Sequence, residues 1–435
     1  MTPTSTSTAT SADPSAATGT GTAATASEPS TSGPSAPVSA ASPNSGAPGL
    51  GSGLSARTPL AERARALVPM LDEYAAYADE QGRIAEPVVE ALHRDGLFTM
   101  WVPEVLGGSE LSAVDSLEVL EDLSYGDASA GWVVMAACLS IGTAGAYLAD
   151  GATAELFAPG KRPVIAGQGT RPGVAVPDGD GFRLTGSWSF ASGLKHGTHI
   201  HTLAVIEGTG EPRIFVVPVE KATLIDNWDV LGLRGTGSID YTLDNVYVPD
   251  GWSHFAVTQD PKRGGTAYHV GIIGFAEQCH SGWALGVGRR MLDELAEMAQ
   301  EKSGRPGSQV DSPSFQEGFA KAEGRFRAAR ALVYEAWTDA DATLARGERL
   351  SVRQHTLVRL ALVNVTDALL EVANHVYLAA GTTALRRGTL QRLLRDVHAG
   401  TQHITSGPGV RQNCGRELAG LAIGQAWQFL DLVPA

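Results

Sequence analysis

The sequence predicts an α+β protein in which a block of strands lies between two helical regions. Apolar residues recur at helical spacing from about Pro59 to Leu148, and runs of β-branched and aromatic residues at two-residue spacing follow from Pro163 to about Val248. After Gly264 the pattern is helical again to the end of the chain. Because helices and strands are segregated and do not alternate, a helix-only bundle and a doubly wound α/β fold are both excluded.

The net charge of the chain argues against some partners. The 435 residues include 33 Lys and Arg against 47 Asp and Glu, a formal net charge of −14. Nonspecific binding to nucleic acid or to an anionic membrane needs a basic surface, so we expect neither partner. Cys138, Cys279 and Cys414 are far apart and form no CxxC pair, which predicts a reducing cytoplasmic location, no disulfide framework and no zinc site.

Four regions are expected along the chain. Residues 1–57 are rich in Thr, Ser, Ala, Pro and Gly and lack the basic and apolar segments of a secretory signal, which predicts a disordered tail. A helical domain over 58–160, a β-domain over 161–260 and a second helical domain over 261–435 follow. The most apolar stretch, Gly131–Leu148, is interrupted by glycines and by Ser140, so we interpret it as a buried core helix and predict no membrane span.

Single strands and late helices are placed by the same spacing. Five strands are predicted, at Phe182–Gly186, Ser187–Ala191, His201–Ile206, Arg213–Pro218 and Tyr241–Val248. Three or four long helices are predicted after the strands, centred near Gly286, Arg327, Leu362 and Ala422.

Three segments contain residues suited to catalysis or ligand binding. His398 and His403 lie about 140° apart around a helix, so they do not suit a shared metal, but either imidazole could act as an acid or base near neutral pH. GSWSFASG at 186–193 combines the indole of Trp188 with a Ser-Gly pair, and Arg234 lies in a Gly-, Thr- and Ser-rich loop. From the residues alone, a core histidine, an ordinary strand and turn, and a polar loop are the alternatives. We predict no metal site.

In their order along the chain, five segments resemble the acyl-CoA dehydrogenase superfamily. They are WVPEVLGG (101–108), GDASAGW (126–132), GSWSFASG (186–193), GLRGTGSIDYTLDNVYVP (232–249) and AGTTALRRGTLQRLLRD (380–396). The resemblance implies a helical N-terminal domain, a middle β-domain and a C-terminal four-helix bundle, usually assembled as a homotetramer.

Within that superfamily, Trp188 followed by FASG, and the run LRGTGS, look like the two-component flavin-dependent monooxygenases. The resemblance implies an enzyme that takes reduced FMN or FAD from a separate NAD(P)H-dependent reductase. With O2 it would form a C4a-hydroperoxyflavin and hydroxylate or N-oxidise an organic substrate, aromatic or from secondary metabolism. It further implies that Trp188, Ser192 and Gly193 lie against the flavin, with the Ser192 hydroxyl near N5. Arg305 and Gly381 would approach a phosphate or the cofactor edge of a neighbouring subunit.

A missing carboxylate distinguishes the chain from most dehydrogenases that it resembles. Those enzymes need a glutamate to remove a substrate proton, and the corresponding position here is Ile404, which cannot accept one. Some relatives place this glutamate on an earlier helix, close to Glu277, so an acyl-CoA dehydrogenase or oxidase with bound FAD is the alternative. A non-catalytic protein that kept the fold is a third hypothesis. His403 aligns with the histidine that the monooxygenases keep beside the flavin and is the predicted catalytic residue.

The expected substrate pocket is apolar. Its wall is predicted from Met135, Cys138 and Leu139 on the helix after the Gly-Trp pair. Trp132 of that pair either contacts the substrate or packs in the core. Phenol hydroxylases of this branch tend to carry a histidine on that helix, and none is present here. A simple phenol is therefore a poor candidate, whereas a larger aromatic polyketide or an indole fits the expectation.

Overall fold

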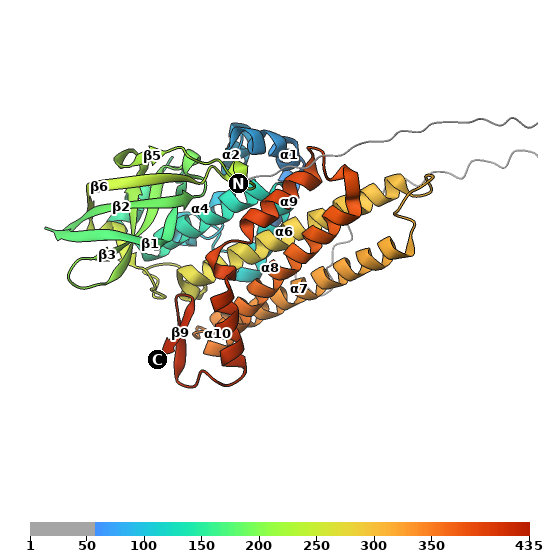
Figure 1. The fold of residues 1–435 in the computed structure, drawn as a ribbon. Helices are drawn as coiled ribbons and strands as arrows, with labels where there is room; N and C mark the ends of the chain where they lie inside the picture. Colours follow the sequence, from blue (N-terminus) through green and yellow to red (C-terminus); the bar gives the residue numbers. More distant parts are fainter. Residues whose placement is uncertain (1–56) are drawn as a thin grey trace, which may run out of the picture. The chain divides into compact units, whose positions relative to one another are not determined.

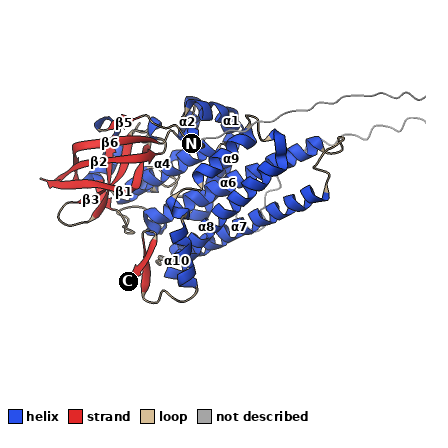
Figure 2. Cartoon of the chain, viewed as in Figure 1, coloured by secondary structure: helices blue, strands red, loops and turns tan. Residues whose placement is uncertain are grey.

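In the structure, a computed structural model that describes residues 57–435, a sheet lies beside the helices, and along the chain its strands come between two helical sets (Figures 1 and 2). This is the predicted α+β arrangement. The predicted tail lies outside the described residues, apart from its last residue, Arg57. The predicted boundaries at 160 and 260 fall in segments that connect the strands to the helices on either side.

The first helical set contains α1 (Pro59–Gln81), α2 (Glu86–Arg94), α3 (Ala113–Gly126), α4 (Ala128–Tyr147) and α5 (Asp150–Leu156). Side-chain caps explain where α3 and α4 begin. Ser112 accepts a hydrogen bond from Asp115 N at the start of α3, and Asp127 accepts from Ala130 N at the start of α4. The cap at Asp127 therefore fixes the first turn of the helix that carries Trp132.

The strands form one seven-stranded sheet in the order β5-β6-β2-β1-β3-β4-β7. Only the β1–β3 pair is parallel. The strands are β1 (Ile165–Asp178), β2 (Gly181–Ala191), β3 (His199–Ile206), β4 (Pro212–Pro218), β5 (Thr223–Ile225), β6 (Ile239–Pro249) and β7 (Ser253–Phe255). The strands predicted at 182–186 and 187–191 are one strand, β2. Sequence analysis missed β1 because its Gly and Pro residues interrupt the alternation that signals a strand.

The second helical set contains α6 (Gly271–Lys302), α7 (Pro313–Ala345), α8 (Val352–Ala380), α9 (Thr389–Gly400) and α10 (Pro408–Leu418). The helices predicted near Gly286, Arg327 and Leu362 are α6, α7 and α8, and α8 contacts α6, α7 and α9. The helix predicted near Ala422 is absent. α10 ends at Leu418, Gly420 and Gly424 adopt positive φ, and the chain closes with the hairpin of β8 (Gln425–Gln428) and β9 (Asp431–Pro434).

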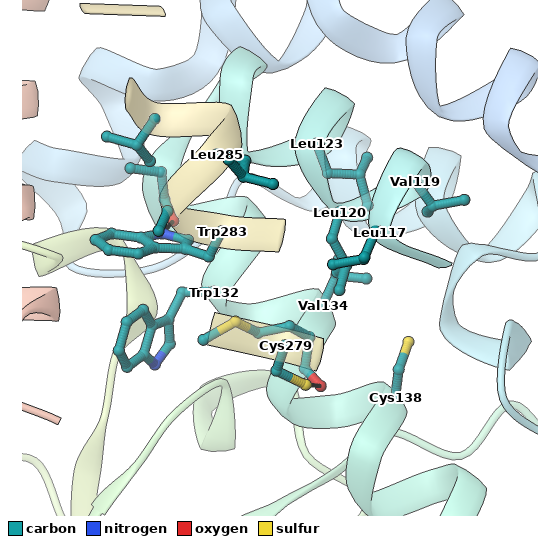
Figure 3. Close-up of a cluster of buried hydrophobic side chains, with 14 of the residues drawn as sticks. Leu117, Val119, Leu120, Leu123, Trp132, Val134, Cys138, Cys279, Trp283 and Leu285 are labelled. Atoms are coloured by element: carbon teal, nitrogen blue, oxygen red, sulfur yellow. Dashed lines mark hydrogen bonds between the residues drawn. The ribbon is translucent and has the colours of Figure 1, made fainter. Parts of the chain in front are cut away.

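The main core joins both helical sets, because α6 packs against α3 and α4. A methyl group at Gly286 would lie 2.3 Å from the Glu121 carbonyl oxygen, so glycine permits α6 to approach α3 closely. Figure 3 shows Trp132 and Trp283 at one edge of this core and the leucines of α3 at the other. By length and composition α4 could cross a membrane, but 89% of its apolar window is buried inside the protein, which is typical of a core helix.

Candidate active site

Four aromatic rings from three distant segments meet at the edge of the main core. Trp132 comes from α4, His280 and Trp283 from α6, and His403 from the segment after α9. The imidazoles of His280 and His403 are 3.9 Å apart between ring centroids. The Trp132 indole lies 4.9 Å from His280, 5.1 Å from Trp283 and 6.0 Å from His403. We call these four residues the aromatic cluster.

His403 is held by its own local backbone. It caps the short 3-10 turn Ile404–Ser406, and its Nδ1 accepts from the Thr405 backbone N–H and lies 2.8 Å from Thr405 Oγ1. Because Nδ1 is used as an acceptor, the neutral ring carries its proton on Nε2. The segment reaches this position because α9 ends in Gly400, where a methyl group would lie 2.2 Å from the Trp283 indole.

Both imidazoles of the cluster are neutral at pH 7. Burial lowers the pKa of His403 to about 4. Burial also lowers the pKa of His280 well below its usual value, and the neighbouring His403 lowers it further. The cluster therefore offers neutral ring nitrogens at a largely buried position, where the lower local dielectric makes a hydrogen bond to a reacting group stronger than in water.

The cluster is connected to the sheet domain through Ser192. Trp132 Nε1 donates a hydrogen bond of 3.0 Å to Ser192 Oγ at the end of β2. The chain turns sharply here: Phe190 has a φ of 66°, Gly193 has a φ of 80°, and Gly193 N donates to Thr236 O at 2.8 Å. The carboxylate of Asp240 stabilises the turn by accepting from Ser189 Oγ and from Phe190 N.

Trp188 does not face the aromatic cluster. Its side chain is fully buried in the core of the sheet domain, stacked on Tyr241 at 5.3 Å, and its Nε1 donates to Leu203 O. The expectation that its indole presents a face to a cofactor is therefore corrected. Because side chains alternate between the two faces of a strand, Phe190, two residues after Trp188, would lie on the same face in a regular strand. The positive φ of Phe190 instead turns its ring outward, where it is 64% exposed.

The loop before β6 lies against the helix that leads to His403. Leu233 has a φ of 53°, and a methyl group at Gly232 would lie 2.0 Å from the Arg395 carbonyl oxygen. Asp396 Oδ1 accepts from Leu233 N at 2.6 Å. Burial raises the pKa of this carboxyl group to about 7. Arg234, singled out in the sequence, donates to Asp79 O and Val230 O and so holds the loop against α1.

Glu277 is engaged in a buried ion pair. Its Oε1 lies 3.1 Å from Arg359 Nε, and both side chains are almost fully buried. Burial raises the pKa of Glu277 to about 7, while the positive charge of Arg359 opposes that shift. Arg359 also donates to Phe429 O and lies over the Trp427 ring at 4.3 Å. Glu277 thus joins α6 to α8 and the C-terminal hairpin.

The predicted pocket residues of α4 have different environments. Trp132 belongs to the aromatic cluster, and Leu139 is half-buried. Met135 is 1% exposed in the main core, where its carbonyl accepts from Cys279 Sγ at 3.2 Å. Cys138 donates to Leu97 O and lies apart from Trp132 (Figure 3), so it does not contribute to a wall beside the cluster.

Arg305 and Gly381 are exposed at the far end of α6 and α8. Lys302 donates to Thr383 Oγ1 there, and a cleft of about 570 Å³ is lined by Glu294, Glu301, Thr382 and Arg386, among others. From His280 to Lys302 an α-helix rises roughly 33 Å. Within one chain, the structure therefore does not bring Arg305 or Gly381 to the aromatic cluster.

Several residues that the fold brings to this site were not predicted from the sequence. They are Phe190, Thr236, Ser238, His280, Trp283 and Thr405. His280 and Trp283 are three residues apart on α6 and so share a face, a spacing that the sequence contained. Nothing in the sequence indicated which face meets His403, because that contact joins segments 123 residues apart.

Comparison with known families identifies two matches. The family model described as acyl-CoA dehydrogenase, N-terminal domain, matches residues 59–156, and that described as acyl-CoA dehydrogenase, C-terminal domain, matches residues 278–407. The second match contains His280, Trp283 and His403.

Curated relatives are similar over most of the chain. An indole-3-acetate monooxygenase of Pseudomonas putida is 31% identical over 347 residues, covering 78% of this chain and 87% of the relative. The flavin-dependent monooxygenase oxygenase subunit HsaA of Rhodococcus jostii is 26% identical, covering 80% and 92%.

Solved structures share the fold. The 3-HSA hydroxylase of a Rhodococcus species superposes with a TM-score of 0.79 at 22% identity, covering 86% of this chain and 99% of that one. XiaF of a Streptomyces species, solved in complex with FADH2 and glycerol, gives a TM-score of 0.76 at 23% identity, covering 83% and 95%.

Proposed function

Because the chain belongs to the acyl-CoA dehydrogenase family, in its branch of flavin-dependent monooxygenases, we propose that it is the oxygenase component of a two-component system. It uses reduced flavin and O2 to hydroxylate or N-oxidise an organic substrate. The observation that carries the proposal is the contact of two neutral imidazoles, His280 and His403, beside a tryptophan that is hydrogen-bonded to Ser192.

The residues at the end of β2 fit a flat ring system. Phe190 offers an exposed aromatic face, and Ser192 Oγ keeps a lone pair free after accepting from Trp132. Gly193 lies close to Val133, where a methyl group would be 3.0 Å from Cγ1. Phe190, Ser192 and Gly193 would hold the flavin, which when bound supplies the electrons that activate O2.

The aromatic cluster supplies protein groups for the transfer of oxygen. His403 holds its proton on Nε2, where it can donate a hydrogen bond to a reacting oxygen atom. It can accept a substrate proton only at Nδ1, once the hydrogen bonds that join this atom to Thr405 are broken. His280 packs against the imidazole and limits how far it can tilt. Trp132 packs against both imidazoles and partly shields them from water.

We further propose an aromatic substrate larger than a simple phenol, such as an indole or a polyketide. Trp132 would contact its ring, and half-buried Leu139 would line the wall farther along α4. Two relatives named for indole-3-acetate favour the indole class for the first test. A role in secondary metabolism and a cytoplasmic location are parts of this proposal.

Arg305 and Gly381 would serve a neighbouring subunit. Both are exposed at the end of α6 and α8 near the 570 Å³ cleft, which is lined by Arg386 and Arg387 together with three glutamates, and guanidinium groups bind phosphate well. A homotetramer would place this cleft near the cofactor of another protomer. A separate NAD(P)H-dependent reductase would supply the reduced flavin.

The proposal is tested with His403→Ala. We expect reduced FMN or FAD to bind as in the wild type while conversion of indole-3-acetate or another aromatic substrate falls 10²- to 10⁴-fold, the usual range for loss of a general acid or base. Hydrogen peroxide should rise as product falls. The control is His398→Ala, five residues earlier on α9. Unchanged product formation would remove His403 from the chemistry, and reduction of bound FAD by an acyl-CoA would favour the dehydrogenase alternative.

A further inference from the structure

Ser192 begins a row of buried hydroxyl groups that leads away from the aromatic cluster. Ser192 Oγ lies 2.9 Å from Ser238 Oγ, and Ser238 Oγ lies 2.6 Å from Thr236 Oγ1. Thr236 Oγ1 donates to Leu233 O at 2.8 Å. Thr236 and Ser238 are 1% and 2% exposed. We call Ser192, Ser238 and Thr236 the hydroxyl chain.

The two ends of the hydroxyl chain set its direction. Thr236 Oγ1 donates its only hydroxyl proton to Leu233 O, so Ser238 must be the donor in the hydrogen bond between Ser238 and Thr236. The proton between Ser238 and Ser192 then comes from Ser192. Ser192 Oγ also accepts from Trp132 Nε1, which leaves it one free lone pair and no free proton. Toward a ligand, Ser192 is an acceptor.

We propose that Ser238 and Thr236 are positioning residues that make Ser192 an acceptor and so favour reduced over oxidised flavin. This inference rests on the proposed function, in which Ser192 helps to hold the flavin, and on the resemblance that implies that its hydroxyl lies near N5. Reduced flavin carries a proton on N5 and can donate it to Ser192. Oxidised flavin has an unprotonated N5, which needs a donor.

A comparison of hydrogen bonds gives the size of the preference. The chain can reverse for oxidised flavin, with Thr236 donating to Ser238, Ser238 to Ser192 and Ser192 to N5. Reversal gives up the bond from Thr236 to Leu233 O, a carbonyl that still accepts from Thr236 N and from Trp228 Nε1. The reduced state therefore keeps one hydrogen bond more, which corresponds to a roughly 2- to 12-fold preference.

Removing either inner hydroxyl abolishes this difference. In Ser238→Ala, Ser192 has no partner for its proton and can donate or accept equally well. In Thr236→Val, the proton of Ser238 has no partner, so the remaining pair can point in either direction at equal cost. Thr236→Ser keeps the hydroxyl group and is the conservative rescue. Ser187→Ala, at an exposed position on the same strand, is the matched control.

The experiment measures dissociation constants for oxidised and, anaerobically, reduced FMN and FAD, using full-length protein and all four variants. We expect the ratio of the oxidised to the reduced constant to fall about 2- to 12-fold in Ser238→Ala and Thr236→Val, and to stay at the wild-type value in Thr236→Ser and Ser187→Ala. Circular dichroism and thermal midpoints verify folding.

Two results would overturn the inference in different ways. If Ser238→Ala and Thr236→Val both keep the wild-type ratio of oxidised to reduced dissociation constants, the hydroxyl chain has no effect on the preference for reduced flavin, and the proposed function stands. If the wild-type protein binds no reduced flavin, the proposed function fails and the inference fails with it. Should an inner variant not fold, the other one still decides the question, because both are expected to give the same ratio.

Discussion

Asp396 Oδ1 accepts a hydrogen bond of 2.6 Å from the backbone N–H of Leu233, which joins the helix leading to His403 to the loop carrying Thr236 and Ser238. The preceding residue, Arg395, strengthens the same junction by donating to Leu231 O and to both carboxylate oxygens of Asp79 on α1. Neither Arg395 nor Asp396 belongs to the aromatic cluster, yet together they hold the loop that positions Ser192 against the segment that positions His403.

Replacing Asp396 should therefore weaken both fold and site. Asp396→Ala leaves the Leu233 N–H buried without a partner, which costs about 1–3 kcal/mol of unfolding free energy. Asp396→Asn keeps an acceptor oxygen and avoids burying a charge, so its loss should be smaller. Urea unfolding measures both, with the exposed Asp244→Asn as the control. Equal losses in the Ala and Asn variants would show that the hydrogen bond is not the stabilising element.

Substitution of Trp188 should lower stability, whereas substitution of Phe190 should weaken flavin binding. Trp188→Ala removes a fully buried indole from the sheet domain and should cost roughly 3–5 kcal/mol. Phe190→Ala removes a ring that is mostly exposed, so little buried apolar surface is lost and the unfolding free energy should stay near the wild-type value. Its affinity for reduced flavin should fall. Thermal unfolding and flavin titration on both variants test the pair. A Phe190→Ala protein with wild-type affinity would refute its assignment to the flavin wall.

Local patterns predicted the order of helices and strands well. The helices α6, α7 and α8 carry uninterrupted helical spacing over many residues, so their centres were located correctly. The helix predicted near Ala422 was wrong because residues 418–423 are interrupted by Gly420 and followed by Gly424, both with positive φ, before the C-terminal hairpin begins. Periodicity cannot distinguish a short apolar run in a turn from a helix. Strand β1 was missed for the opposite reason, since its pairing compensates for weak local preference.

The site could be predicted only as far as single motifs reach. His403 and Ser192 were named from motifs, and the structure joins both to Trp132. His280 and Ser238 have no local signature, because their contacts come from packing between α6, α9 and the sheet domain. Trp188 was misassigned since alternation along β2 decides which aromatic residue faces outward, and the reversal of φ at Phe190 is invisible in the sequence.

The pH dependence of stability should report the burial of His403. The pKa of an unfolded histidine is near 6.5 and that of His403 is about 4, so between these values the unfolded chain binds more protons than the folded one. Stability from this group is present above pH 6.5 and is lost as the pH falls toward 4. Relative to His403→Gln, the wild type should lose on the order of 3 kcal/mol over that window.

Unfolding free energies at pH 7.5, 6, 5 and 4 measure this loss. Comparing two chains under the same conditions cancels the titrating groups that do not contact His403, including Glu277 and Asp396. Ile404→Ala changes a half-exposed neighbour and keeps the imidazole, so its curve should run parallel to that of the wild type. Parallel curves for His403→Gln and the wild type would mean that His403 is not buried as a neutral ring.

Glu277 gives the sharpest contrast between stability and chemistry. Its carboxylate compensates the buried charge of Arg359, so Glu277→Gln should cost about 3–5 kcal/mol of unfolding free energy. The double variant Glu277→Gln/Arg359→Met removes both charges and should lose less than the two single variants added together. Aromatic hydroxylation per folded molecule should stay near the wild-type rate, because the aromatic cluster is intact. A hundredfold loss of turnover in Glu277→Gln with unchanged stability would instead identify this carboxylate as a base that removes a substrate proton.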